Sequence, residues 1–202
     1  MLLYGHPLSG NTHKVRLLLA ALELAYEERL IDITTGVHKL PGFLALNPRG
    51  QLPVLVDGDV TVHDAQAILV YLARRYDPSA TWFPDAPADA ARVVGWLSFA
   101  ANEIQNGVHA ARSHHLLGAP ISLDHTTAIA SASLRVLDAR LRGRRFLELD
   151  RPTIADLACF PCVALAPEGK IGLADHPDIQ RWAARIQALP RYVAMAGLEA
   201  RA

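Results

Sequence analysis

Cysteine is scarce in this chain, with 2 residues among 202. Two thiols cannot build the disulfide framework that stabilises small secreted proteins. An excess of charge of one sign is also missing, because 20 Lys and Arg residues balance 20 Asp and Glu residues. An even balance gives no electrostatic support for binding nucleic acid or an anionic membrane. We therefore expect a reduced, cytoplasmic protein without a nucleic-acid partner.

Long apolar runs are absent as well, since no stretch approaches the roughly 18–20 residues that a membrane-spanning helix needs. The first residues, MLLYGHPLSG, have neither the basic flank nor the long apolar stretch of a secretory signal. We therefore predict no membrane association. Hydrophobic residues still make up 51% of the chain, which is typical of a globular protein with a substantial core.

The N-terminal part of the chain alternates between strand-like and helix-like patterns. Apolar spacing and turn residues predict strands at Met1–Gly5 and Tyr26–Ile33, a helix at Val15–Leu22, a hairpin at Val54–Val62 and a helix at Ile68–Tyr76. The hairpin prediction rests on the Asp-Gly-Asp sequence between two β-branched runs. The stretch before the hairpin reads as a loop with one helical turn. The order is β-α-β, a connection, then β-β-α.

A cluster of three prolines follows these elements and interrupts any regular pattern. We therefore predict a domain at residues 1–77, a linker at residues 78–87 and a second domain at residues 88–202. No convincing strand pattern lies beyond the linker, so the second domain is predicted to be all-helical.

Three helices of the second domain have clear sequence signals. Apolar residues recur at intervals of three and four at Val94, Leu97, Ala101, Ile104 and Val108. A second helix is predicted from about residue 123 to residue 141. A last one is predicted to start at Pro177 and to stop at Pro190, two prolines that suit a helix start and stop. The sequence Thr-Ile-Ala-Asp at residues 153–156 has the spacing of a capping box, with aspartate in place of the usual glutamate or glutamine.

The turn after the first predicted strand, residues 7–14, combines a serine with a helix start. Free N–H groups and a partial positive charge at a helix start favour an anion there. The hydroxyl of Ser9 could donate a hydrogen bond to such an anion. Alternatively, Ser9 or Asn11 merely caps the helix. A catalytic triad is disfavoured because no G-x-S-x-G elbow surrounds Ser9.

Two further junctions in the first domain carry polar groups. Pro53 cannot donate to a sheet ladder, so it belongs at the start of a strand. A cis bond before Pro53 would turn the backbone N–H and C=O of Leu52 sideways, although a single proline does not decide the isomer. Asp64 is a natural N-cap whose carboxylate suits the next helix start, either as a plain cap or in ligand binding.

With these motifs in this order, the chain resembles the cytosolic glutathione transferases, and among them the serine-type bacterial members related to the theta class. The resemblance rests on Ser9-Gly10-Asn11 and on residues 47–55, 64–69 and 151–156. It implies a thioredoxin-like domain that binds glutathione and an all-helical domain that supplies a pocket for a small hydrophobic electrophile. It also implies a homodimer and no metal cofactor.

The resemblance implies a role for each residue of the first domain's motifs. Ser9, with Asn11 as support or competitor, would hydrogen-bond the glutathione sulfur. Pro53 would be cis, and the backbone of Leu52 would pair with the cysteinyl part of the tripeptide. The reaction would be attack of the sulfur on an electrophilic carbon of an apolar compound.

Four more positions would hold the two ends of glutathione. Gln51 and His38 would lie near its glycine end, and Asp64 and Ala65 would hold its γ-glutamyl end. The family usually has serine or threonine where this chain has Ala65. The missing side-chain hydrogen bond is worth about 1.5–3 kcal/mol, a factor of roughly 10–150 in affinity. Glutathione binding is therefore expected to be weakened at this position.

Several alternatives stay open at the level of sequence. A thioredoxin-like oxidoreductase needs a cysteine near Ser9, and the only C-x-x-C spacing, Cys159 and Cys162, lies in the wrong domain. Two packed thiols beside a helix kink are the simpler interpretation. A non-catalytic binding or scaffold protein is a second alternative, made credible by Ala65. A glutathione-dependent peroxidase or isomerase is a third, because one fold hosts several chemistries.

The histidines of the helical half suggest a metal site only weakly. His109 and His114 are five residues apart, which does not place them on one helix face, and no cysteine neighbours them. By the resemblance, the long helix that carries them borders the second-substrate pocket. Trp96, His109, Arg112 and His115 are the candidates for that pocket, and the sequence does not choose among them.

Overall fold

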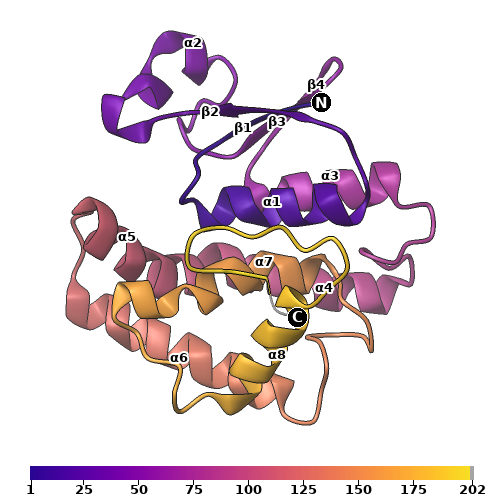
Figure 1. The fold of residues 1–202 in the computed structure, drawn as a ribbon, viewed down its shortest axis with the longest axis vertical. Coiled ribbons are helices and arrows are strands. Elements are labelled where there is room, and N and C mark those ends of the chain that lie inside the picture. Colours follow the sequence, from indigo (N-terminus) through magenta and orange to yellow (C-terminus); the bar gives the residue numbers. More distant parts are fainter. Residues whose placement is uncertain (201–202) are drawn as a thin grey trace.

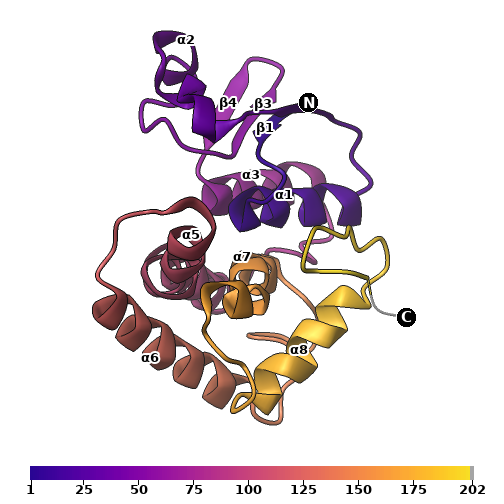
Figure 2. The same cartoon turned by 60° about the vertical axis from the view of Figure 1, so that its left-hand side comes forward.

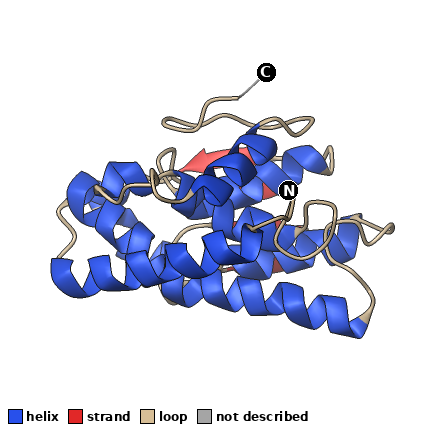
Figure 3. Cartoon of the chain, turned by 90° about the horizontal axis from the view of Figure 1, so that it is seen from below, coloured by secondary structure: helices blue, strands red, loops and turns tan. Residues whose placement is uncertain are grey.

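The computed structural model describes residues 1–200. A small sheet lies at one end of the molecule (Figure 1), and most of the chain is helical (Figure 3). The first half contains β1 (Leu2–Gly5), α1 (Gly10–Ala21), β2 (Glu27–Leu30), β3 (Val54–Asp57), β4 (Val60–His63) and α3 (Ala65–Tyr76). This is the predicted β-α-β and β-β-α order, and the thioredoxin-like fold of the first half is confirmed.

The four strands form one sheet in the order β2-β1-β3-β4. β1 pairs with β2 in parallel and with β3 in antiparallel orientation, so that Leu2 lies opposite both Glu27 and Val56. β3 and β4 form the predicted hairpin, which closes between Asp57 and Val60. Helices α1 and α3 lie together on the face of the sheet that is turned toward the helical half (Figure 2).

The connection between β2 and β3 has more structure than the predicted single turn. It contains two 3₁₀ turns, Ile33–Thr35 and Val37–Lys39, and the short helix α2 (Pro41–Leu44). Pro41 begins α2, where the fixed φ of proline is favourable. These short elements bring His38 and the following loop to the edge of the site described below.

The second half is helical, as predicted. It contains α4 (Pro87–Phe99), a π-helical stretch (Ala100–His109), α5 (Ala110–Leu117), α6 (Leu123–Leu141), α7 (Ile154–Ala164), a 3₁₀ turn (Ala166–Gly169) and α8 (Pro177–Gln187). Helix α4 begins at Pro87, the last residue of the predicted linker. The exact division at residues 77 and 88 stays a prediction.

One detail of the long helical stripe was wrong. Val94 is 44% exposed, whereas Val93 is completely buried. Ala101 is likewise exposed, and Ala100 takes its place in the core. Leu97, Ile104 and Val108 are buried as predicted. The two errors arise because valine occurs at both 93 and 94 and alanine at both 100 and 101, and the pattern alone does not separate the neighbours.

Helix α7 occupies the centre of the helical half and packs against α1 (Figures 1 and 2). The predicted capping box at its start is confirmed: Thr153 accepts a hydrogen bond from Ala155 N, and Asp156 accepts one from Thr153 N. Residues 154–163 of α7 are all buried. Among residues 1–200, no helix has the length and apolar character needed to cross a membrane.

Candidate functional site

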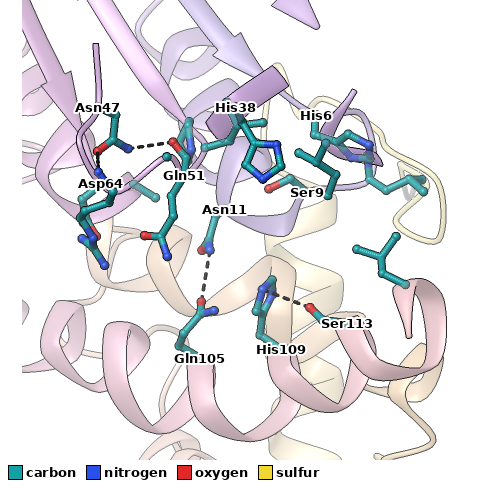
Figure 4. Close-up of a pocket in the computed structure, with 18 of the residues that line it drawn as sticks. His6, Ser9, Asn11, His38, Asn47, Gln51, Asp64, Gln105, His109 and Ser113 are labelled. Atoms are coloured by element: carbon teal, nitrogen blue, oxygen red, sulfur yellow. Dashed lines mark hydrogen bonds and ion pairs between the residues drawn. The ribbon is translucent and has the colours of Figure 1, made fainter. Parts of the chain in front are cut away.

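A cavity of about 510 Å³ lies between the two halves, and Figure 4 shows most of its lining. One wall comes from the thioredoxin-like half and contains every site residue predicted from the sequence: Ser9, Asn11, His38, Gln51, Leu52, Pro53, Asp64 and Ala65. The other wall comes from the π-helical stretch and α5. Residues far apart in the sequence thus meet around one space, although the roles assigned to them stay predictions.

Ser9 stands at the N-terminus of α1 and caps it. Its Oγ accepts a hydrogen bond from Thr12 N at 3.1 Å. A hydroxyl has one donor hydrogen besides its acceptor lone pairs, so a capping serine can still donate a hydrogen bond to a ligand. The cap also holds the side chain in a fixed orientation at the cavity wall. The capping and the ligand-binding interpretations of Ser9 are therefore compatible.

Asn11 connects the two walls of the cavity. Its Nδ2 donates to Gln105 Oε1 at 3.2 Å, and its Oδ1 accepts from Lys14 Nζ at 2.7 Å. The amide group is held from both sides, with one Nδ2 hydrogen left over. Figure 4 shows this hydrogen bond between Asn11 and Gln105, which joins the two walls.

The segment before β3 is fixed by a small network. The Leu52–Pro53 peptide bond is cis, as the resemblance implied. Asn47 is 1% exposed; its Nδ2 donates to Gln51 O at 2.8 Å and its Oδ1 accepts from Arg49 N at 3.0 Å. Asn47 therefore sets the shape of the loop that presents Gln51 and Leu52, a role that the sequence analysis did not identify.

Gly50 completes this loop in a conformation that favours glycine. Its φ is +55°, and a Cβ there would lie 2.7 Å from the backbone oxygen of His38. Lys39 Nζ donates to Gly50 O at 2.7 Å. The close approach joins the turn that carries His38 to the loop that carries Gln51.

Asp64 occupies the start of α3 with a φ of +81°, which is rare for residues other than glycine. Its Oδ1 accepts from Gln66 N at 2.9 Å and from Ala67 N at 3.2 Å. Its Oδ2 lies 3.6 Å from Arg49 Nη1, and the carboxylate is 36% exposed. Ala65 begins α3 and lines the same cavity. One oxygen of Asp64 thus caps the helix while the other is available to a ligand.

Two histidines lie on the thioredoxin-like side. Burial, and then the neighbouring Lys39, lower the pKa of His38. Burial also lowers the pKa of His6, partly opposed by Asp32. His6 Nδ1 accepts a hydrogen bond from Leu8 N at 3.2 Å, which fixes the turn before Ser9. Both rings are neutral at neutral pH and available for hydrogen bonding without competing charge.

On the helical wall, the structure chooses two of the four candidates from the sequence. His109 and Arg112 line the cavity, and Trp96 and His115 do not. Arg112 is 5% exposed; its Nε donates to Glu168 Oε2 at 2.7 Å and its Nη1 to Leu8 O at 2.7 Å. Arg112 therefore ties the turn before Ser9 to the helical half. Gln105 and Ser113 also line this wall and were missed, because the π-helical stretch changes which side chains face the cavity.

The two cysteines lie inside α7, as predicted, and both are free and buried. Burial raises the pKa of Cys159. Burial acts in the same direction on Cys162, but the charge of Lys14 and a contact with His109 Nδ1 at 3.8 Å lower the pKa of that thiol to about 7. Neither cysteine lines the cavity. Within residues 1–200, no group of three or more His, Cys, Asp or Glu residues is arranged to hold a metal ion.

A thioredoxin-like sheet with a cis-proline, joined to a helical bundle across a shared cavity, defines a class of two-part thiol-binding proteins. Family models for the N-terminal and C-terminal domains of glutathione S-transferase match residues 1–74 and 122–190. The chain belongs to the glutathione S-transferase family.

Individual relatives agree with this assignment over nearly the whole length. Glutathione S-transferase 3 of Zea mays is 35% identical over 201 residues, which cover 94% of this chain and 90% of that protein. The crystal structure of a glutathione S-transferase from Pseudomonas fluorescens superposes with a TM-score of 0.89 at 31% identity, covering 96% of this chain and 98% of that one. The disulfide-bond oxidoreductase YfcG of Escherichia coli is 27% identical over 200 residues, covering 93% and 90%.

Proposed function

We propose that this protein is a serine-type, theta-like glutathione transferase that activates the glutathione thiol for attack on a small apolar electrophile. One observation carries the proposal: a single cavity gathers Ser9 and Asn11, the Leu52–Pro53 segment and Asp64. These are the positions at which the sulfur, the cysteinyl backbone and the γ-glutamyl end would be held.

The binding roles follow from the groups that each residue offers. The backbone N–H and C=O of Leu52, just before β3, pair with the cysteinyl part of glutathione as if it were an added strand. The partly exposed Oδ2 of Asp64, which lies 3.6 Å from Arg49 Nη1, receives the γ-glutamyl ammonium, while the Ala65 N–H at the start of α3 faces its carboxylate. Gln51 and His38 hydrogen-bond the glycine end.

The chemical task at Ser9 is to hold a thiolate. A free thiol has a pKa near 8.5, so only about 3% is ionised at pH 7. Lowering that pKa by about two units requires roughly 2.7 kcal/mol of preferential stabilisation of the anion. One hydrogen bond to a charged group supplies about 1.5–3 kcal/mol, and the start of α1 about 0.3–1 kcal/mol more. Ser9 and the helix start are together sufficient.

The helical wall supplies the second pocket. Leu116 and Leu117 give it apolar surface, and His109 and Ser113 add polar groups. In the reaction the thiolate forms a carbon–sulfur bond, the leaving group departs with its electron pair, and the thiol proton goes to solvent. Domains at 1–77 and 88–202, a homodimeric assembly and a cytoplasmic location belong to the same proposal.

The relationship to a disulfide-bond oxidoreductase favours one alternative, a glutathione-dependent redox activity in the same cavity. A peroxidase would use the same thiolate and consume a second glutathione to release a disulfide. A binding protein without activity is the remaining alternative, since Ala65 offers no hydroxyl to glutathione.

A turnover assay with three electrophile classes tests the proposal. Purified protein is incubated with reduced glutathione and an activated aryl halide, an epoxide or an organic hydroperoxide. We expect a glutathione conjugate with at least one of the first two, and an Ala65→Ser variant with a KM for glutathione lower by about tenfold. Glutathione disulfide formed from the hydroperoxide alone would favour the redox alternative. No product from any class with either protein would contradict an enzymatic role.

A further inference from the structure

Lys14 is an unusual residue in this fold because its side chain is completely buried. It lies on α1, one turn after the cap, and is 0% exposed. Its Nζ donates to Asn11 Oδ1 at 2.7 Å. No carboxylate oxygen lies within 4.0 Å of this ammonium in the part of the chain that the structure describes. A buried cation without a carboxylate partner is costly, which requires an explanation from its surroundings.

The other ionisable groups around Lys14 do not neutralise it. From α7, Cys159 and Cys162 interact with the charge of Lys14, and Asp156 interacts with Cys159. Asp156 is engaged by Leu147 N, Thr153 and the Trp182 indole. From the helical wall, His109 contacts Cys162, and Arg112 pairs with Glu168. Among the described residues named here, the Cys162 thiol is the group that can place a negative charge near Lys14, because Lys14 itself helps to lower its pKa to about 7.

The positive charge of Lys14 is connected to the cavity by a single residue. Asn11 accepts from Lys14 on one side and donates to Gln105 on the other, and Asn11 itself lines the cavity beside Ser9. A donor that is polarised by a neighbouring cation forms stronger hydrogen bonds to an anion. An anion placed at Ser9 and Asn11 would be a countercharge for Lys14 on the cavity side, opposite the Cys162 thiol on α7.

We propose that Lys14 is the buried countercharge of the glutathione thiolate, acting through Asn11 as a positioning residue. This inference rests on the proposed function, because it requires glutathione in the cavity. It goes beyond that function because it assigns part of the thiol activation to Lys14, a buried cation of α1, in addition to the Ser9 hydroxyl.

The test measures the ionisation of bound glutathione. The ultraviolet absorbance of the thiolate is recorded as a function of pH to obtain its pKa. The protein carries Cys162→Ser, so that no second thiol titrates near neutrality. Two variants are compared in that background: Lys14→Met, which removes both charge and hydrogen bond, and Lys14→Gln, which keeps an N–H donor for Asn11. Lys170→Met is the matched control, because it removes an exposed lysine that does not line the cavity.

We expect both Lys14 variants to raise the pKa of bound glutathione by about one unit, equal to a tenfold fall in its acid ionisation constant. The pH profile of kcat/KM for the electrophile, measured with glutathione at saturation, should shift by the same amount. Lys170→Met should change neither the pKa of bound glutathione nor this profile. Calorimetric binding of glutathione and the Tm of each variant are measured in parallel to establish folding. If Lys14→Gln binds glutathione with an unchanged thiol pKa, the inference is wrong while the proposed function stands. If the Cys162→Ser parent and the wild type both fail to bind glutathione, both proposals are wrong.

Discussion

Two aspartates stand at helix starts in the two halves of the molecule, and they differ in what surrounds them. Asp156, at the start of α7, is 0% exposed and accepts hydrogen bonds from Leu147 N, Thr153 N and Trp182 Nε1. Asp64, at the start of α3, caps its helix through one oxygen and is 36% exposed. Asp64 is the N-cap of α3, whereas Asp156 is the third residue of α7, where it completes a capping box with the N-cap Thr153. Both carboxylates serve a helix start, but the one in the helical half is fully engaged by protein donors and the other is partly exposed.

The difference shows how a cap can serve either the fold or a ligand. An oxygen whose donors all come from the protein contributes to stability and offers nothing to solvent. An oxygen that faces a cavity, on a backbone with positive φ, is available to a ligand at some cost to the local backbone. We therefore expect substitutions at Asp156 to change stability and substitutions around Asp64 and Ser9 to change function.

The largest effect is expected for Asp156→Ala. The substitution removes the acceptor for Thr153 N in the capping box of α7 and leaves the Trp182 indole and the Leu147 N–H buried without an acceptor, for a loss of about 3–5 kcal/mol. Chemical denaturation of wild type and variant measures the change in the free energy of unfolding. A loss under about 1 kcal/mol, the typical value of a surface cap, would remove the contrast between the two aspartates.

Ser9→Ala should come next and should act on turnover. We expect kcat to fall by about 10- to 100-fold, because the hydroxyl stabilises the thiolate by roughly 1.5–3 kcal/mol. The dissociation constant for glutathione should change much less, since the tripeptide is held by other groups. Steady-state kinetics and calorimetry separate the two quantities, with Ser9→Thr as the control that keeps a hydroxyl. An unchanged kcat would assign the sulfur to Asn11 or Thr12 instead.

Asp64→Asn separates the two functions of a single cap. Asparagine is as good an N-cap as aspartate, so the free energy of unfolding should change by less than about 0.5 kcal/mol. The negative charge is lost, so glutathione affinity should fall by about tenfold or more. Calorimetry and denaturation are both required. If the variant loses stability but keeps its affinity for glutathione, Asp64 acts only as a helix cap and contributes to the fold alone.

The last prediction concerns His13, a neighbour of Lys14 that does not line the cavity, and its effect is confined to acid. It is 0% exposed, and neither ring nitrogen has a hydrogen-bond partner within residues 1–200. Burial, and then Arg16, lower its pKa to about 3. The unfolded chain therefore binds an extra proton between about pH 6.5 and pH 3, so this residue makes stability fall as the pH falls through that window.

The expected slope is about 1.4 kcal/mol per pH unit at most. His13→Phe keeps an aromatic ring against Tyr192, whose ring centroid lies 6.3 Å away. The variant should be less sensitive to acid than the wild type and should bind glutathione equally well. Equal slopes in denaturation at pH 6 and pH 4 would show that His13 does not carry this acid sensitivity.

The fold and one wall of the cavity could be predicted from the sequence because their signals are local. Ser9 at a helix start, Pro53 before a strand and Asp64 at a helix cap are each read from a few neighbouring residues. The structure brings all three to one cavity. The alternating pattern of the first half likewise depends only on short stretches of sequence.

The other wall depends on contacts between distant segments. Gln105 and His109 face the cavity through a π-helical stretch that no spacing rule predicts. Gly107 belongs to this stretch and packs against Ala130, where a Cβ would lie 2.8 Å from the backbone. Lys14 was overlooked because lysine is usually exposed, and its burial results from the packing of α1 against α7.

Calorimetric titration of the wild-type protein with reduced glutathione tests the central claim most directly, because it requires no knowledge of the electrophile. We predict saturable binding at one site per chain, competed by an S-alkyl glutathione that occupies the same cavity and extends into the helical wall. No heat of binding at millimolar glutathione would contradict the claim and would favour a binding or scaffold protein in which Ala65 marks a lost site.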